Sequence, residues 1–140
     1  MATANFYLNF NGNTEDAFNF YKSVLGGDFL TLQRFKDTPA AETVPAPDRD
    51  KIMHISLPLG KNSMLMATDA PESMGFKLTE GNNVHISLST ESEEETSRLF
   101  NGLSAGGKVT MPLEKQFWGA TFGSFTDKFG IQWMVNFQQQ

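Results

Sequence analysis

Residues 5–27 read NFYLNFNGNTEDAFNFYKSVLGG, and this stretch predicts a strand, a helix and a helix stop in succession. Apolar and polar side chains first alternate, which is typical of a half-buried strand. Residues 11–13 break the strand, and Asn13 or Thr14 is expected to cap the helix that follows. Gly26 and Gly27 end the helix. Its predicted buried face carries Ala17, Phe18, Tyr21, Val24 and Leu25.

The same plan recurs at an offset of eighty residues. Val84, Ile86 and Leu88 alternate with polar residues as a second strand. Ser92 opens a capping-box pattern, and a second double glycine ends the second helix. Three strands are expected after each helix, at about 28–36, 51–59 and 63–68, and at about 108–111, 120–126 and 131–137.

The two copies predict an α+β fold made of two β-α-β-β-β modules within a single domain, 1–140. Module one spans about 3–69, a linker about 70–83, and module two about 84–137. Residues 37–50 contain three prolines and are expected to form an exposed loop.

Composition excludes several classes of function. The 140 residues include no cysteine, so disulfides, zinc–thiolate sites and thiol nucleophiles are absent. A net charge of −5 without a basic stripe argues against a nucleic-acid partner. No apolar run is long enough for a membrane span, and no signal peptide is recognisable at the N-terminus. We therefore expect a cytoplasmic protein.

Five motifs carry a resemblance to a known family: NGNTEDAFNFYK, MHISL, MATDA, QFWG and TDKFGIQWMVN. Together they resemble the PhnB-like branch of the glyoxalase/bleomycin-resistance/extradiol-dioxygenase (vicinal oxygen chelate) superfamily. The resemblance implies paired modules whose mixed sheets form facing half-barrels around a cleft, and it implies a homodimer.

Metal-using members of the superfamily place four ligands on the first and last strands of the two modules. The resemblance puts Asn5, Met66, His85 and Met134 at these positions. Only His85 matches the ligand types of the relatives, because methionine is a soft, neutral ligand for zinc or nickel. We therefore expect no cofactor, and His85 as the surviving ligand if a divalent metal does bind.

Strand alternation predicts which side chains face away from the helices. On the first strand these are Tyr7 and Asn9, and His54 and His85 share the same parity. Either histidine is a candidate catalytic acid or base, or a hydrogen-bonding contact to a ligand. The alternative for both is a buried polar side chain that a neighbouring strand satisfies.

Four other residues are candidate ligand contacts. Asp69 could bind a polar group, position a histidine or cap the linker. Trp118 could stack on a ligand, or close one end of the half-barrel together with Phe117. Met66 and Met134 could line an adaptable apolar pocket or only fill a core. Trp133 alternates with apolar residues and is expected in the core.

Three functions follow from these features. The first is a protein that binds a small, partly apolar molecule, or a metal-independent enzyme that acts on one. The second is a metal-dependent glyoxalase- or dioxygenase-type enzyme. The third is a dimeric protein whose cleft is filled by side chains. The sequence leaves open whether the protein is an enzyme and which molecule it binds.

Overall fold

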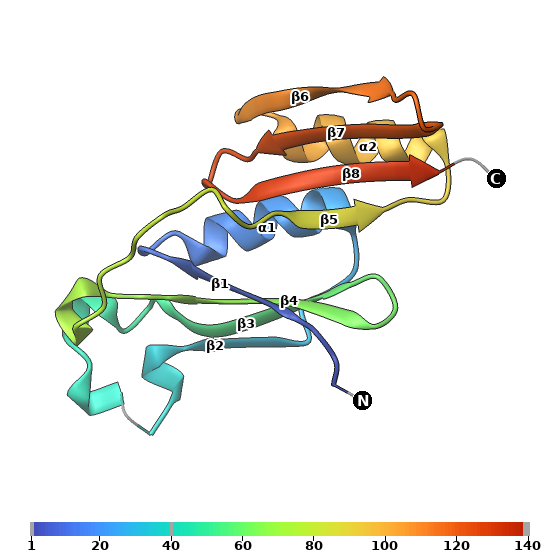
Figure 1. Ribbon diagram of the computed structural model, residues 1–140. Helices are drawn as coiled ribbons and strands as arrows, with labels where there is room; N and C mark the ends of the chain where they lie inside the picture. The colour runs from blue at the N-terminus through green and yellow to red at the C-terminus, as the bar shows by residue number, and fades with distance from the viewer. Residues whose placement is uncertain (1, 40, 139–140) are drawn as a thin grey trace. The chain divides into compact units, whose positions relative to one another are not determined.

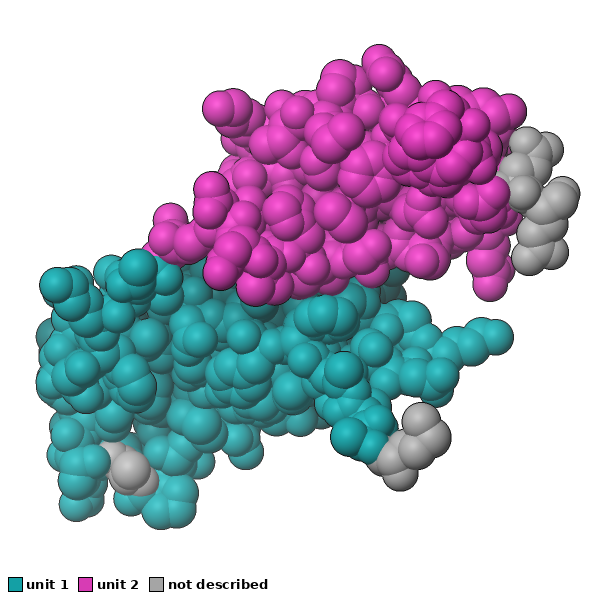
Figure 2. Space-filling view, viewed as in Figure 1, with its two compact units in different colours: residues 1–79 teal, residues 80–140 magenta. Residues whose placement is uncertain are grey.

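The computed structural model describes residues 2–39 and 41–138, which belong to two compact units (Figure 1). Unit 1 covers residues 1–79 and unit 2 covers residues 80–140 (Figure 2). The boundary between them falls inside the predicted linker 70–83. Each unit contains one four-stranded mixed sheet and one α-helix, which confirms the α+β class.

The sheet of unit 1 has the strand order β1-β4-β3-β2. Of the neighbouring strands only β1 and β4 run parallel. Helix α1 connects β1 to the three antiparallel strands β2, β3 and β4, the last of which returns beside β1. Helix α1 packs on one face of this sheet, where Ile55, Leu57, Leu65 and Ala67 are fully buried. The elements are β1 (Phe6–Phe10), α1 (Thr14–Leu25), β2 (Thr31–Arg34), β3 (Ile52–Leu59) and β4 (Ser63–Asp69).

The connection between β2 and β3 is more ordered than the expected loop. Strand β2 is shorter than the predicted 28–36, because the chain turns into a 3-10 helix directly after Arg34. The Asp37 carboxylate closes this turn by accepting from the Arg34 backbone N–H. Val44 anchors the segment in the core, and its carbonyl accepts from Arg49 Nε at 3.0 Å. The short helices are η1 (Phe35–Asp37), η2 (Ala41–Thr43) and η3 (Ala46–Asp48), with η4 (Glu72–Met74) after β4.

Unit 2 repeats the topology with the order β5-β8-β7-β6, and β5 and β8 are its parallel pair. Helix α2 covers one face of this sheet, where Leu103, Phe125 and Val135 are fully buried. Trp133 is also fully buried, as predicted, and its indole N–H donates to Asp127 at 2.8 Å. The elements are β5 (Ile86–Ser89), α2 (Glu93–Ser104), β6 (Lys108–Lys115), β7 (Ala120–Thr126) and β8 (Gln132–Gln138).

The first strand of unit 2 starts later than the sequence predicts. Strand β5 begins at Ile86, and Val84 is 72% exposed instead of facing the helix. The ladder with β8 begins at Ile86, and the Val84 carbonyl accepts from the side-chain amide of Gln132. The other expected strands are present, and β6 runs on to Lys115 beyond the predicted 108–111.

The two α-helices begin by different means. Ser92 caps α2 as predicted, because its hydroxyl accepts from the Glu95 N–H. Asn13 holds the corresponding position before α1 but makes no capping bond with its side chain. Asp69, at the end of β4, accepts from the Thr14 N–H in its place. No helix in the described part of the chain is long and apolar enough to cross a membrane.

Candidate functional site

The face of the unit 1 sheet opposite α1 is called here the open face of unit 1. Its centre is a row of side chains across three strands, in which Tyr7 of β1 lies opposite Met66 of β4. Met66 in turn lies opposite Ser56 of β3. Residues paired across strands share a face of the sheet, so these three side chains are neighbours. The row joins an aromatic ring, a thioether and a hydroxyl.

His54 belongs to the same open face. Its ring centroid lies 5.9 Å from that of Tyr7, and the ring planes are tilted by 31°. The Tyr7 side chain is half exposed. Asn9, two residues after Tyr7 and therefore on the same face of β1, is also exposed and pairs with Thr68. Strand alternation therefore places Tyr7, Asn9, His54 and Met66 on one surface, as the sequence predicts.

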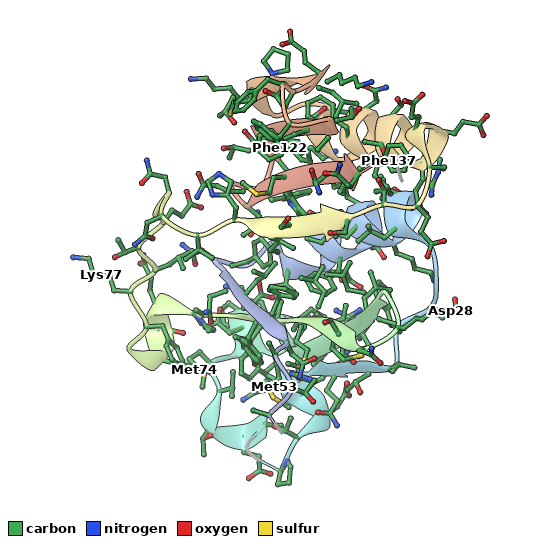
Figure 3. The ribbon with its side chains drawn as sticks, turned by 45° about the vertical axis from the view of Figure 1, so that its right-hand side comes forward. Asp28, Met53, Met74, Lys77, Phe122 and Phe137 are labelled. Carbon is green, nitrogen blue, oxygen red and sulfur yellow. The ribbon has the colours of Figure 1, made fainter. Side chains whose placement is uncertain are left out.

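The equivalent face of the unit 2 sheet, opposite α2, is the open face of unit 2. Met134 of β8 lies at its centre, between Ser87 of β5 and Ser124 of β7. The Ser124 hydroxyl lies 2.7 Å from the Thr110 hydroxyl, within hydrogen-bond distance. Phe122, labelled in Figure 3, is two residues before Ser124 and therefore on the same face. This surface again combines a thioether, hydroxyls and an aromatic ring.

A serine–methionine pair recurs at the centre of both open faces. Ser56 pairs with Met66 in unit 1, and Ser124 pairs with Met134 in unit 2. Both serines are buried, at 5% and 4% exposure, and both methionines are half-buried. Sequence reasoning chose the methionines and did not select the serines as site residues. The equal Ser–Met spacing of ten residues, 56 to 66 and 124 to 134, is the signal that could have found them.

Apart from the outer strands β2 and β6, the strands in the described part of the chain contribute no charged side chain to either open face. In the described strands β1, β3, β4, β5, β7 and β8, Asp69 is the only charged residue. Asp69 has the parity of Leu65 and Ala67, so it lies on the helix side of the sheet. The open face of unit 1 can therefore offer hydroxyls, amides, an imidazole and a thioether without a fixed charge, because β2 adds only Thr31 and Gln33 to it. On the open face of unit 2, β6 brings the charged residue Glu114 opposite Phe122.

The structure places Asp69 among backbone donors. One carboxylate oxygen accepts from the N–H groups of Gly12 and Thr14 and from the Thr14 hydroxyl, at 3.0, 3.1 and 2.7 Å. The other accepts from the Ile52 N–H at 2.8 Å. The side chain is buried, with four donors around two oxygens. Among the roles considered for Asp69 these contacts favour capping, at the start of α1 and not in the linker.

Two other predicted contacts lie at the margins of unit 2. His85 comes directly before β5 and is exposed, although its parity matches that of Ser87. Trp118 lies in the turn between β6 and β7 and is 52% exposed. It packs edge-on against Phe117, which is 98% exposed, with ring centroids 4.9 Å apart. Ser87, two residues after His85, is the residue of β5 that pairs with Met134.

The four positions implied for a metal divide between the units. Asn5 and Met66 belong to unit 1, and His85 and Met134 to unit 2. The Asn5 side-chain oxygen already accepts from the Met64 N–H at 2.9 Å. Two neutral thioethers, one amide and one imidazole supply no charge for a divalent ion, so this donor set does not fit one. Among residues 2–39 and 41–138, no three His, Asp or Glu side chains come together as a possible metal site.

Perturbed pKa values in unit 1 belong to ion pairs outside its open face. Hydrogen bonds from Arg34 lower the pKa of Glu15, whose carboxylate the guanidinium contacts at 2.6 and 3.1 Å. Lys51 and then Ser73 lower the pKa of Asp48 by hydrogen bonding to its carboxylate. The Glu15–Arg34 pair joins α1 to the end of β2, and the Asp48–Lys51 pair joins η3 to the residue before β3.

Comparison with known proteins identifies related sequences and structures. A family model described as the Glyoxalase/Bleomycin resistance protein/Dioxygenase superfamily matches residues 4–135. Protein YjdN of Escherichia coli is 33% identical over 96% of this chain and 94% of its own length. The crystal structure of PA1353 from Pseudomonas aeruginosa is 42% identical, covers both chains fully and has a TM-score of 0.87. The PhnB protein from Bacillus cereus shares the fold, with 23% identity, 97% and 99% coverage and a TM-score of 0.77.

Proposed function

Because this chain belongs to the glyoxalase/bleomycin resistance protein/dioxygenase superfamily, we propose that its open sheet faces bind a small, uncharged and partly apolar molecule. The superfamily includes both binding proteins and enzymes, so membership alone does not select a ligand. The chemistry of the side chains on the two open faces supplies that selection.

The observation that carries the proposal is the uncharged row of Ser56, Met66 and Tyr7 beside His54. A sheet face that needs only solubility is usually covered with charged residues, as the exposed face of a helix is. This face has instead a half-exposed phenol, an imidazole and a flexible thioether, which are typical of adaptable pockets for small molecules. Unit 2 repeats the central serine–methionine pair.

The polar contacts in this proposal come from His54 and Tyr7. The imidazole can both donate and accept a hydrogen bond, and the phenol can do the same. A metal-independent reaction on this face would use the His54 imidazole as acid or base. The facing of the two sheets around one shared ligand stays a prediction from the family resemblance.

The first experiment is a thermal-shift screen of the full chain with small uncharged aromatic and aliphatic compounds. A ligand at 100 times its Kd adds about 2.7 kcal/mol to the free energy of unfolding, which gives a clear rise in Tm. We expect at least one compound to raise Tm in a saturable way.

A matched set of variants then locates the binding. Tyr7→Ala and His54→Ala remove two groups from the open face, whereas Leu30→Ala removes an apolar side chain that is 68% exposed beside the same sheet. The first two should abolish the Tm shift by the compound, and the control should keep it. A shift that survives both open-face variants would refute the proposal. A screen without any saturable compound would favour a face that is filled or serves only dimer contacts.

A further inference from the structure

Unit 2 contains a hollow at one end of its open face, beyond the Ser124–Met134 pair. It measures about 480 Å³ and is lined by Glu80, Gly81, Asn82, Thr126, Gly130 and Gln132. Residues 80–82 come from the segment before β5, and the other three come from the ends of β7 and β8 and the turn between them. The volume is within the range of sites for small molecules.

The walls of this hollow are held in place by hydrogen bonds. Asp127 accepts from the N–H groups of Phe129 and Ile131 with its carboxylate, and from the Gly130 N–H with its carbonyl. These bonds define the turn that forms one wall. The Gln132 side-chain amide donates to the Val84 carbonyl at 2.9 Å and so ties β8 to the segment that carries Glu80. A ligand would meet a preformed wall on this side.

Gly130 lets the Glu80 carboxylate approach this turn. A side chain at position 130 would begin 3.2 Å from one Glu80 oxygen and 3.4 Å from the other. The φ angle of Gly130 is +91°, in the region that favours glycine. The Glu80 carboxylate therefore lies against this turn, at the rim of the hollow.

The lining supplies hydrogen-bond acceptors and one negative charge. Glu80 contributes a carboxylate, and Asn82, Thr126 and Gln132 contribute oxygens that can accept hydrogen bonds, while the Asn82 amide and the Thr126 hydroxyl can also donate. None of the six lining residues carries a positive charge. The Nε2 atom of Gln132 is already engaged with Val84, which leaves its Oε1 as an acceptor. The single charge of the lining favours a positively charged ligand whose N–H groups can donate to the Glu80 carboxylate.

We propose that this hollow of unit 2 is a binding site for a small organic ammonium ion, with Glu80 as its counter-charge. The hollow adjoins the Ser124–Met134 pair, because Thr126 and Gln132 pair two residues further along the same two strands, but its lining does not include that pair. The inference goes beyond the proposed function because it assigns a cation, and not an uncharged molecule, to this hollow. Affinity should be modest and should fall with salt, because the carboxylate is exposed.

A titration followed by ¹H–¹⁵N NMR tests the proposal with two probes of equal length. At neutral pH and low salt, 1,4-diaminobutane carries two ammonium groups, and 1,4-butanediol carries two hydroxyls in their place. We expect the diamine to shift the amide signals of Gly81 and Gly130 in a saturable way, and the diol to leave them unchanged. Equal shifts by both probes, or no saturable shift by the diamine, would overturn the proposal.

Three variants separate a specific site from attraction by net charge. Glu80→Gln should raise the Kd for the diamine about fivefold, the factor for one exposed charge pair. Glu94→Gln removes the same charge from the exposed start of α2 and should leave the Kd unchanged. Asn82→Asp adds a carboxylate to the lining and should lower the Kd. Equal effects of Glu80→Gln and Glu94→Gln would sink the assignment.

A fourth variant keeps this test distinct from that of the proposed function. Tyr7→Ala removes a residue of unit 1 and should not change the Kd for the diamine. Loss of diamine binding in Tyr7→Ala would show that the diamine binds at the open face of unit 1, and would overturn the site in unit 2.

Discussion

Asp69 shows how one residue can join three segments of unit 1. Its carboxylate binds the turn after β1, the first residue of α1 and the first residue of β3. Three backbone N–H groups are satisfied by one side chain, and two of them, those of Thr14 and Ile52, would otherwise be buried without a partner. Charge-assisted hydrogen bonds of this kind are stronger than neutral ones, and the negative charge also suits the positive end of the helix.

The first prediction is that Asp69→Asn lowers the free energy of unfolding by about 3 kcal/mol. An asparagine offers one acceptor in place of two and turns an N–H group toward backbone donors. Urea denaturation measures the change. The control is Asp28→Asn, because Asp28 lies at the surface (Figure 3) and its carboxylate, 91% exposed, contacts only Lys22 in a surface ion pair. A loss no larger than that of the control would contradict the role of Asp69.

Asp48 is a second residue whose charge supports the fold. Its buried carboxylate contacts Lys51 at 2.6 Å and accepts from the Ser73 hydroxyl. These contacts hold the pKa of Asp48 below its ordinary value. A carboxyl group with a lowered pKa stabilises the folded state above its unfolded pKa, and this contribution disappears as the pH falls through the folded pKa.

The second prediction concerns the pH dependence of this contribution. The native protein should be more stable than Asp48→Asn at about pH 7, and the difference should shrink as the pH falls below about 4. The Tm of both proteins, measured across this range, gives the difference directly. The contribution of other groups to acid unfolding cancels in the subtraction. A difference that stays constant or grows toward acid pH would exclude the proposed ionised pair.

At the scale of elements, α2 packs on β7 because a large side chain of the helix, Phe100, lies over a residue of the strand without a side chain, Gly123. Gly123 of β7 is buried, and a side chain there would begin 2.6 Å from the Phe100 ring of α2. It would also lie 3.0 Å from the backbone of Leu113 in β6. The Phe100 ring packs edge-on against Phe125, with centroids 5.2 Å apart. An aromatic ring on the helix therefore occupies the space above a glycine on the strand.

The third prediction is that Gly123→Ala costs about 2 kcal/mol of stability, because the new methyl group overpacks a filled core. The cost should be smaller when Phe100→Leu is already present, since a leucine is smaller and can yield. Chemical denaturation of the two single variants and the double variant gives the coupling energy. Gly81→Ala is the matched control, because its new methyl group would meet only Asn83 at 3.8 Å. Independent costs in the double variant would contradict this contact.

At the scale of the whole molecule, both units use the same strand ladder. In each, the first strand pairs in parallel with the last, and the two middle strands of the sheet have partners on both sides. The outer antiparallel strands, β2 and β6, have one neighbouring strand each in the sheets described. Val109 and Met111 of β6 are more than two-fifths exposed.

The fourth prediction follows from this arrangement. Backbone amides near 65–67 in β4 and 123–125 in β7 should exchange with solvent most slowly, and those of β2 and β6 much faster. Hydrogen exchange followed by NMR on the full chain measures both sets. Dilution of the sample is the control, because association through an edge would protect it only at high concentration. Exchange of β6 as slow as that of β7 at high dilution would contradict a free edge.

Patterns among neighbouring residues in the sequence determined most of the secondary structure of this protein and the face of the sheet on which its side chains lie. Alternation in residues 5–10 and 52–57 predicted that Tyr7 and His54 share the face away from the helix, and their ring contact agrees. The two helices, their ends at the double glycines and most strands were predicted from residues next to one another in the chain. The resemblance carried by motifs such as QFWG predicted the superfamily, which the family model confirms. Such features depend on backbone geometry and neighbouring residues, which a single sequence displays.

Tertiary structure decided the features that depend on distant residues. The cap of α1 comes from Asp69, which lies 55 residues beyond Thr14, so local rules assigned it to Asn13 or Thr14. The serine–methionine pairs are related by an offset of 68, whereas the first strands are related by eighty, because unit 1 has the longer connection between its second and third strands. Loop length changes the offset without changing the fold. Residues that meet across a sheet are therefore matched by register in space and not by distance along the chain.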